Sequence, residues 1–231
     1  MVKQDLIDRS PVRYFEKVLG GGLKAGEIGV ITSKKGLGKT SVLVQIGLDM
    51  LLQGKKVIHV SFNQHSDYVI SWYEDIFNEM AKKKNLDKAE EVKDELIRNR
   101  ILLNFSQDVV TSQAIGRTLK ALSEGGSKAD ALIIDGFDFS KASVEDFKAM
   151  KDLAKEMNIG IWYSGNVDGL SDAKNAVPSV LLPFKDVLDV VIFLEPKPDF
   201  IQLKVLKDRD VSVHNDIDLK LDTKTLLIAE K

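Results

Sequence analysis

The chain carries at positions 33–41 the stretch Ser33-Lys34-Lys35-Gly36-Leu37-Gly38-Lys39-Thr40-Ser41. It matches the phosphate-binding pattern G-x-x-x-x-G-K-[ST], except that Ser33 stands where the pattern has its first glycine. Residues 27–32 before it are typical of a buried strand, and apolar residues recur at helical spacing through 39–52 after it. A strand, a glycine-rich turn and a helix in this order are the context in which the pattern binds phosphate.

The residue types of this loop suit a nucleotide with its metal ion. In such a turn, backbone N–H groups and the helix N-terminus point towards the phosphate chain, and Gly36 and Gly38 let the backbone close around it. Lys39 is predicted to neutralise the β- and γ-phosphates, and the Thr40 hydroxyl to hold Mg²⁺. Ser33 fits its position if its φ is negative. All nine residues are therefore predicted to bind ATP or ADP; the alternative is a lysine-rich turn that caps an ordinary helix.

A second candidate metal residue is Asp135. Residues 131–135 form an apolar strand that ends in this carboxylate, which is the form of the second motif of nucleotide triphosphatases. In that role Asp135 binds Mg²⁺ through its water shell. The alternative is an aspartate that caps the turn before Gly136. The nearby phosphate-binding loop favours the metal role.

Length and charge limit the other possibilities. No repeat, low-complexity tract or linker divides the 231 residues, so we predict a single domain over 1–231. The 33 Lys and Arg nearly cancel the 35 Asp and Glu, so overall charge neither supports nor excludes nucleic-acid binding. The sequence has no cysteine, no apolar leader and no apolar run of membrane length. We therefore expect a cytoplasmic protein without a membrane partner.

Strand-like and helical stretches alternate along the chain. Candidate strands lie at 27–32, 56–61, 101–104, 131–135, 159–164, 187–194, 201–207 and 217–228, the last as a hairpin around Asp222-Thr223. Candidate helices lie at 39–52, 67–81, 88–99, 111–124 and 143–157. This order predicts an α/β fold with a mostly parallel sheet flanked by helices and antiparallel strands near the C-terminus. Residues 165–183 have loop-like composition, and a loop of that length is usually functional or mobile.

Three further segments resemble the KaiC-type branch of the RecA-like P-loop ATPases. They are the lead-in Val18–Glu27 with its glycines, the strand Lys56–Phe62, and the run Leu203–Arg209. The resemblance spans nearly the whole chain and implies a RecA-like P-loop NTPase fold. It also implies ATP bound at subunit interfaces of a homo-oligomer, usually a hexameric ring or a filament. Members of the family serve in DNA transactions, clock or signalling assemblies, so a further protein partner is expected but not identified.

One departure from the family concerns catalysis. RecA-like enzymes place a glutamate just after the second strand as the general base, and this chain has Asn63-Gln64 there. Neutral amides can orient a water molecule but cannot accept its proton. The neighbouring His65 and Asp67 are alternative bases, although His65 also fits a polar residue that precedes a helix. The expected activity is therefore ATP binding with slow or absent hydrolysis.

Two other features correspond to functional positions of the family. Lys207 and Arg209 match a Lys-x-Arg pair that reaches the γ-phosphate of the neighbouring subunit; the alternative is an exposed strand end paired with Asp208 and Asp210. Asn166 matches a polar sensor of the γ-phosphate, or is a turn residue after Gly165. In the loop that contacts DNA in some relatives, the cation is Lys174, against Asp168 and Asp172. This does not favour DNA binding.

Four functions remain in competition. The first is a KaiC-like, nucleotide-dependent interaction module, and the second is an active ATP-driven recombinase or helicase acting on DNA. The third is a ParA-like ATPase, because Lys34 precedes Lys39 by five residues as the signature lysine of that class does. Lys35, at an expected glycine, and the KaiC-type lead-in count against it. The fourth is a degenerate domain without nucleotide, which the intact Lys39, Thr40 and Asp135 disfavour.

Overall fold

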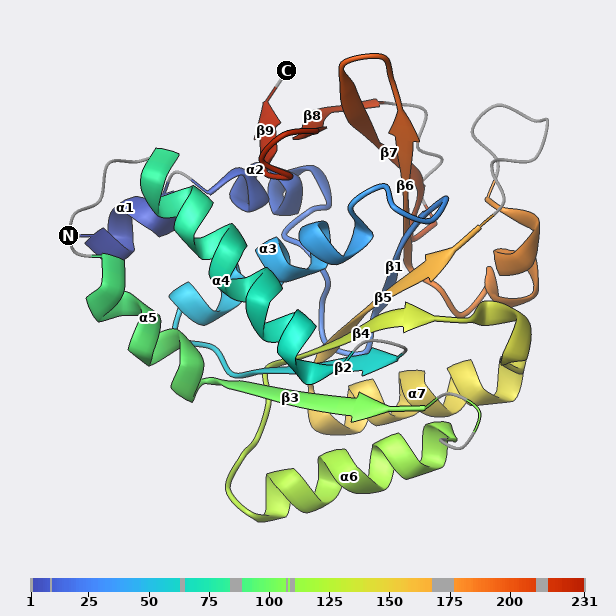
Figure 1. The fold of residues 1–231 in the computed structure, drawn as a ribbon. Helices are drawn as coiled ribbons and strands as arrows, with labels where there is room; N and C mark the ends of the chain where they lie inside the picture. The colour runs from blue at the N-terminus through green and yellow to red at the C-terminus, as the bar shows by residue number, and fades with distance from the viewer. Residues whose placement is uncertain are drawn as a thin grey trace.

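A mixed β-sheet forms the centre of the computed structural model (Figure 1). The structure describes residues 2–8, 10–62, 65–83, 89–106, 108, 111–167, 177–210 and 216–230. The parallel strands are, in spatial order, β3 (Arg100–Phe105), β2 (Val57–Phe62), β4 (Ala131–Phe137), β5 (Gly160–Asn166), β1 (Ile28–Ser33) and β6 (Val190–Pro196). The antiparallel strands β7 (Phe200–Asp208), β8 (Asp216–Asp222) and β9 (Ile228–Glu230) extend it beyond β6.

Helices cover both faces of the parallel strands (Figure 1). On one face lie α1 (Val2–Asp8), α2 (Pro11–Val18), α3 (Lys39–Leu52), α4 (Ser66–Lys83) and α5 (Ala89–Arg98). On the other face lie α6 (Ser112–Glu124), α7 (Val144–Met157) and the 3₁₀ turns η1 (Phe139–Lys141) and η2 (Ser179–Phe184). Two hydrophobic cores result, because successive strand residues such as Val57 and Ile58 are buried on opposite faces.

The predicted fold class is confirmed: a parallel core, flanking helices and antiparallel C-terminal strands. The phosphate-binding stretch follows the carboxyl end of β1, and β4 is one strand removed, with β5 between them. This is the edge of an open α/β sheet at which ligands bind. The hairpin predicted around Asp222-Thr223 is also present, because the Asp222 carboxylate accepts the backbone N–H groups of Lys224 and Thr225.

Some boundaries differ from the sequence-based prediction. The helices α1 and α2 were not predicted, since they are short and polar, although Pro11 at the first turn of α2 is a helix-start signal. The expected loop 165–183 is partly regular: Asn166 pairs with Ser33 as the last residue of β5, and residues 179–184 form η2 after Pro178. Residues 168–176 lie outside the described part of the chain. None of the described helices is long and apolar enough to cross a membrane.

Candidate nucleotide site

The phosphate-binding loop connects β1 to α3 through two glycines in the left-handed region. Gly36 has φ 84° and Gly38 has φ 82°, a conformation that L side chains rarely adopt. Space also requires glycine at position 38, because an added Cβ would overlap the Leu221 side chain of β8. Ser33 is not among the described residues of positive φ, so the departure from the first glycine is accommodated without backbone strain. Lys34, Lys35 and Gly36 are exposed at the tip of the loop.

The Lys39 side chain folds back into this loop. Its Nζ lies 3.3 Å from the Ser33 carbonyl oxygen, 3.1 Å from Ser33 Oγ and 3.0 Å from the Lys34 carbonyl oxygen. Burial lowers the pKa of Lys39 to about 8, although the nearby Asp135 carboxylate opposes this shift. A phosphate would supply the negative charge that the buried ammonium lacks. Ser33 thus has a role that a glycine could not fill, because its hydroxyl is one of the acceptors for Lys39.

Thr40 and Asp135 are 95 residues apart in sequence and meet in the structure. Thr40 Oγ1 donates a hydrogen bond of 2.8 Å to Asp135 Oδ2. The other carboxylate oxygen, Oδ1, accepts a hydrogen bond from Ser164 Oγ on β5, and Ser164 Oγ in turn accepts the Gly136 N–H at 2.9 Å. Asp135 is buried, with 3% of its surface exposed. Ser164 was missed as a site residue, although the predicted strand 159–164 ends on it.

The oxygen atoms gathered here fit Mg²⁺. A hydroxyl and a carboxylate are hard oxygen ligands, and Mg²⁺ in nucleotide sites typically binds one or two protein groups with water and phosphate oxygens completing its shell. Within the described ranges, no group of three or more His, Cys, Asp or Glu could hold a metal ion by itself. Thr40 and Asp135 therefore suit a metal that arrives with a nucleotide rather than one held in a protein cage.

The C-terminal hairpin closes one side of the loop. The Leu226 carbonyl oxygen, between β8 and β9, accepts hydrogen bonds from Ser41 Oγ at 2.5 Å and from Gln45 Nε2 at 3.0 Å. Gln45 Oε1 in turn accepts the Ile228 N–H at 2.7 Å. The Ser41 hydroxyl, predicted as part of the nucleotide site, is thus bonded to the hairpin. These bonds fix the first turns of α3 against the end of the sheet.

Comparisons with known proteins identify the fold. No protein-family model matches the chain, and no curated protein matches it. Among solved structures, it is similar to an ATPase domain, with a TM-score of 0.68 over 97% of this chain and 98% of that chain, at 14% sequence identity. The fold is that of the RecA-like P-loop ATPases. At this identity the likeness concerns architecture alone, so the resemblance to the KaiC branch remains a prediction.

Around this RecA-like core, the predicted catalytic and sensor positions differ in how they are placed. Asn63 and Gln64 lie outside the described residues. His65 Nδ1 is 3.2 Å from an Asp67 carboxylate oxygen, and both side chains are mostly exposed at the start of α4. Asn166 is exposed and lies beside Ser33 through the register of β5 with β1, so it is adjacent to the phosphate loop. Lys174 is outside the described part of the chain.

Lys207 and Arg209 lie at the other end of the RecA-like sheet, where β1 and β6 begin. Strand β7 ends at Asp208, and Arg209 takes φ 54°, so the expected alternation of residues 207 and 209 on one face of a strand does not apply. Lys207 Nζ donates to the Leu188 carbonyl oxygen. Burial lowers the pKa of Lys207, against the influence of Asp189.

The Arg209 guanidinium is held by several acceptors of its own chain. It donates to the Glu27 carboxylate at 2.8 and 2.7 Å, to the Leu19 carbonyl oxygen at 3.1 Å and to the Gly22 carbonyl oxygen at 2.8 Å. Burial alone would raise the pKa of Glu27, but its hydrogen bond from Arg209 outweighs that effect and lowers it. The pair fixes the glycine-rich lead-in to β1, so a role for Arg209 at a neighbouring subunit would require these bonds to be exchanged.

Proposed function

We propose that the chain binds ATP or ADP with Mg²⁺ at residues 33–41 and acts as a nucleotide-dependent, self-assembling module of the KaiC type. One observation carries the proposal: the Thr40 hydroxyl and the Asp135 carboxylate lie 2.8 Å apart beside the loop that holds Lys39. The sequence predicted that these three residues act together from two separate motifs. Their proximity is what a shared metal and phosphate chain require.

Each residue of the site has a distinct part in the proposal. The backbone N–H groups of the loop and the start of α3 would bind the phosphates, and Lys39 would exchange its bonds to Ser33 and Lys34 for phosphate oxygens. Thr40 would turn its hydroxyl from Asp135 towards Mg²⁺. Asp135, held by Ser164, would keep its carboxylate towards the metal's water shell. When bound, Mg²⁺ neutralises charge on the β- and γ-phosphates.

Slow or absent hydrolysis is part of the proposal. Asn63 and Gln64 occupy the position of the usual glutamate and cannot take a proton from water. His65 and Asp67 are paired with each other in solvent, which does not favour either as the base. An active ATP-driven protein acting on DNA is the competing function. Turnover that DNA stimulates would favour it.

The test combines nucleotide binding with a size measurement. Mg²⁺·ATP at about a hundred times its Kd should stabilise the chain by about 2.7 kcal/mol in thermal unfolding. Lys39→Ala should abolish this shift, whereas Lys35→Ala, the matched exposed lysine of the same loop, should retain much of it. Light scattering on the same samples should show larger particles with Mg²⁺·ATP than without. An unchanged shift in Lys39→Ala would refute the site, and a monomer at saturating Mg²⁺·ATP would refute assembly.

A further inference from the structure

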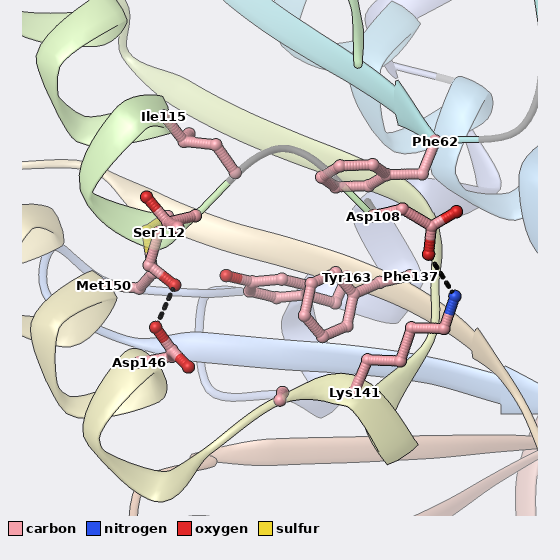
Figure 2. Close-up of a pocket in the computed structure, with 11 residues that line it drawn as sticks. Phe62, Asp108, Ser112, Ile115, Phe137, Lys141, Asp146, Met150 and Tyr163 are labelled. Atoms are coloured by element: carbon pink, nitrogen blue, oxygen red, sulfur yellow. Dashed lines mark hydrogen bonds and ion pairs between the residues drawn. The ribbon is translucent and has the colours of Figure 1, made fainter. Parts of the chain in front are cut away.

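A cavity lies on the face of the sheet opposite α3 and the phosphate loop. Its volume is about 210 Å³, and it sits between the carboxyl ends of β2, β4 and β5 and the helices α6 and α7 (Figure 2). Its walls are mainly apolar: Phe62, Phe137 and Tyr163 come from the three strands, Ile115 from α6 and Met150 from α7. The nucleotide site does not use any of these side chains.

The aromatic walls are packed firmly against one another. The ring centroids of Phe62 and Phe137 are 5.8 Å apart, and those of Phe137 and Tyr163 are 5.2 Å apart, each pair close to edge-to-face. Such pairs prefer this geometry because the positive edge of one ring meets the negative face of the other. The cavity therefore has a defined shape and an aromatic surface.

The Tyr163 hydroxyl is a polar group of this cavity that the described residues leave without a hydrogen bond. Tyr163 is 2% exposed and lines the cavity, and its Oη has no partner among the residues that the structure describes. The other polar side chains drawn in Figure 2 are paired: Ser112 Oγ with Asp146 at 2.9 Å, and Lys141 Nζ with Asp108 at 2.6 Å. Burial, with Asp146 nearby, raises the pKa of Tyr163 well above its ordinary value, so the hydroxyl stays protonated and can donate.

Phe137 reaches the cavity because β4 is irregular after Asp135. In a regular strand, residues 135 and 137 would lie on the same face. The register with β5 shifts between Ile134 and Phe137, and Gly136 takes φ 76° at a place where a Cβ would lie 2.6 Å from the Phe62 carbonyl oxygen. The same Gly136 donates its N–H to Ser164. The cavity wall and the hydrogen bonds of Asp135 are thus neighbouring parts of one strand.

We propose that this cavity binds a small, single-ring aromatic molecule carrying an oxygen or nitrogen acceptor for the Tyr163 hydroxyl. The volume is sufficient, since an apolar cavity of roughly 150 Å³ already accommodates benzene. The aromatic walls favour a planar ring, and a buried donor without a partner favours a ligand that supplies an acceptor over one that does not. The proposal does not rest on nucleotide binding, because the cavity and the phosphate loop are formed by different side chains.

The test compares two probes of nearly the same shape, p-cresol and toluene, by NMR titration of the full chain. The cresol oxygen should make p-cresol bind about fivefold more tightly than toluene, which is the usual effect of one hydrogen bond. Tyr163→Phe removes a single oxygen and keeps the ring, so it should fold and bind both probes equally. Tyr68→Phe, at an exposed tyrosine of α4, should keep the preference. Contacts from the bound probe to the Phe62 and Phe137 rings should locate it.

Three results would overturn the proposal. They are the absence of binding by either probe, an unchanged preference in Tyr163→Phe, and water alone in the cavity of a crystal soaked with p-cresol. Ala142→Leu, at the cavity wall, should exclude both probes. If this variant does not fold, Tyr163→Phe still decides. Lys39→Ala should bind p-cresol as the unmodified chain does, so a failure of the nucleotide site and a failure of the cavity remain distinguishable.

Discussion

Ser164→Ala is expected to weaken metal-dependent nucleotide binding by removing a hydrogen bond from Asp135. Ser164 Oγ donates to Asp135 Oδ1 and accepts the Gly136 N–H at 2.9 Å, so its loss affects both groups. A hydrogen bond to a charged group contributes about 1.5–3 kcal/mol. We therefore expect the free energy of unfolding to fall by about 2–3 kcal/mol. Thr40 still bonds Asp135 Oδ2, so the carboxylate should be misdirected rather than lost.

The effect on affinity should depend on the metal. In calorimetric titrations, Ser164→Ala should bind Mg²⁺·ATP about tenfold more weakly, a change of about 1.4 kcal/mol. Binding of ADP in the presence of a chelator should change much less. Thr32→Val is the matched control: Thr32 is equally buried on the adjacent strand and its hydroxyl bonds the Gly165 carbonyl oxygen at 3.3 Å, not Asp135. Equal losses with and without Mg²⁺, or the same metal-dependent loss in Thr32→Val, would refute the role assigned to Ser164.

The remaining predictions concern catalysis, pH, stability and coupling. Asn63→Glu should raise the rate of phosphate release by about 10²–10⁴ if the rest of the site is intact, and no increase would contradict the missing-base explanation. The pKa of Lys39 is about 8 in the folded chain against 10.5 ordinarily, so the free energy of unfolding should rise with pH between these values, and Lys39→Met should lose that rise in urea titrations. Arg209→Ala should lower the free energy of unfolding by about 3 kcal/mol because it leaves Glu27 unpaired, and a change below about 0.5 kcal/mol would be inconsistent with the contacts described. A cavity ligand such as p-cresol should alter the Kd for Mg²⁺·ATP through Gly136, and this effect should be absent in Tyr163→Phe.

The sequence predicted the parts of the site that local patterns specify. The strand, glycine turn and helix around Lys39 are contiguous, and Asp135 ends an apolar strand, so each could be recognised from a short segment. Ser164 could not be assigned, because its contact with Asp135 depends on β5 being inserted between β4 and β1.

Long-range contacts account for the other differences. Arg209 and Glu27 are 182 residues apart, and no local signal pairs them. The resemblance suggested instead that Arg209 reaches a neighbouring subunit. The change of face at Phe137 likewise depends on the positive φ of Gly136 and on the register shift with β5. Neither can be inferred from the alternation of strand residues.

The most direct test of the central claim is a calorimetric titration of Mg²⁺·ATP into the unmodified chain, Lys39→Ala and Lys35→Ala. The nucleotide site at residues 33–41 predicts one nucleotide per chain, binding lost in Lys39→Ala, and binding largely kept in Lys35→Ala. Lys39 Nζ lies within the loop at 3.0–3.3 Å from its acceptors, whereas Lys35 is exposed at the tip. Equal affinity in Lys39→Ala and the unmodified chain would contradict the claim.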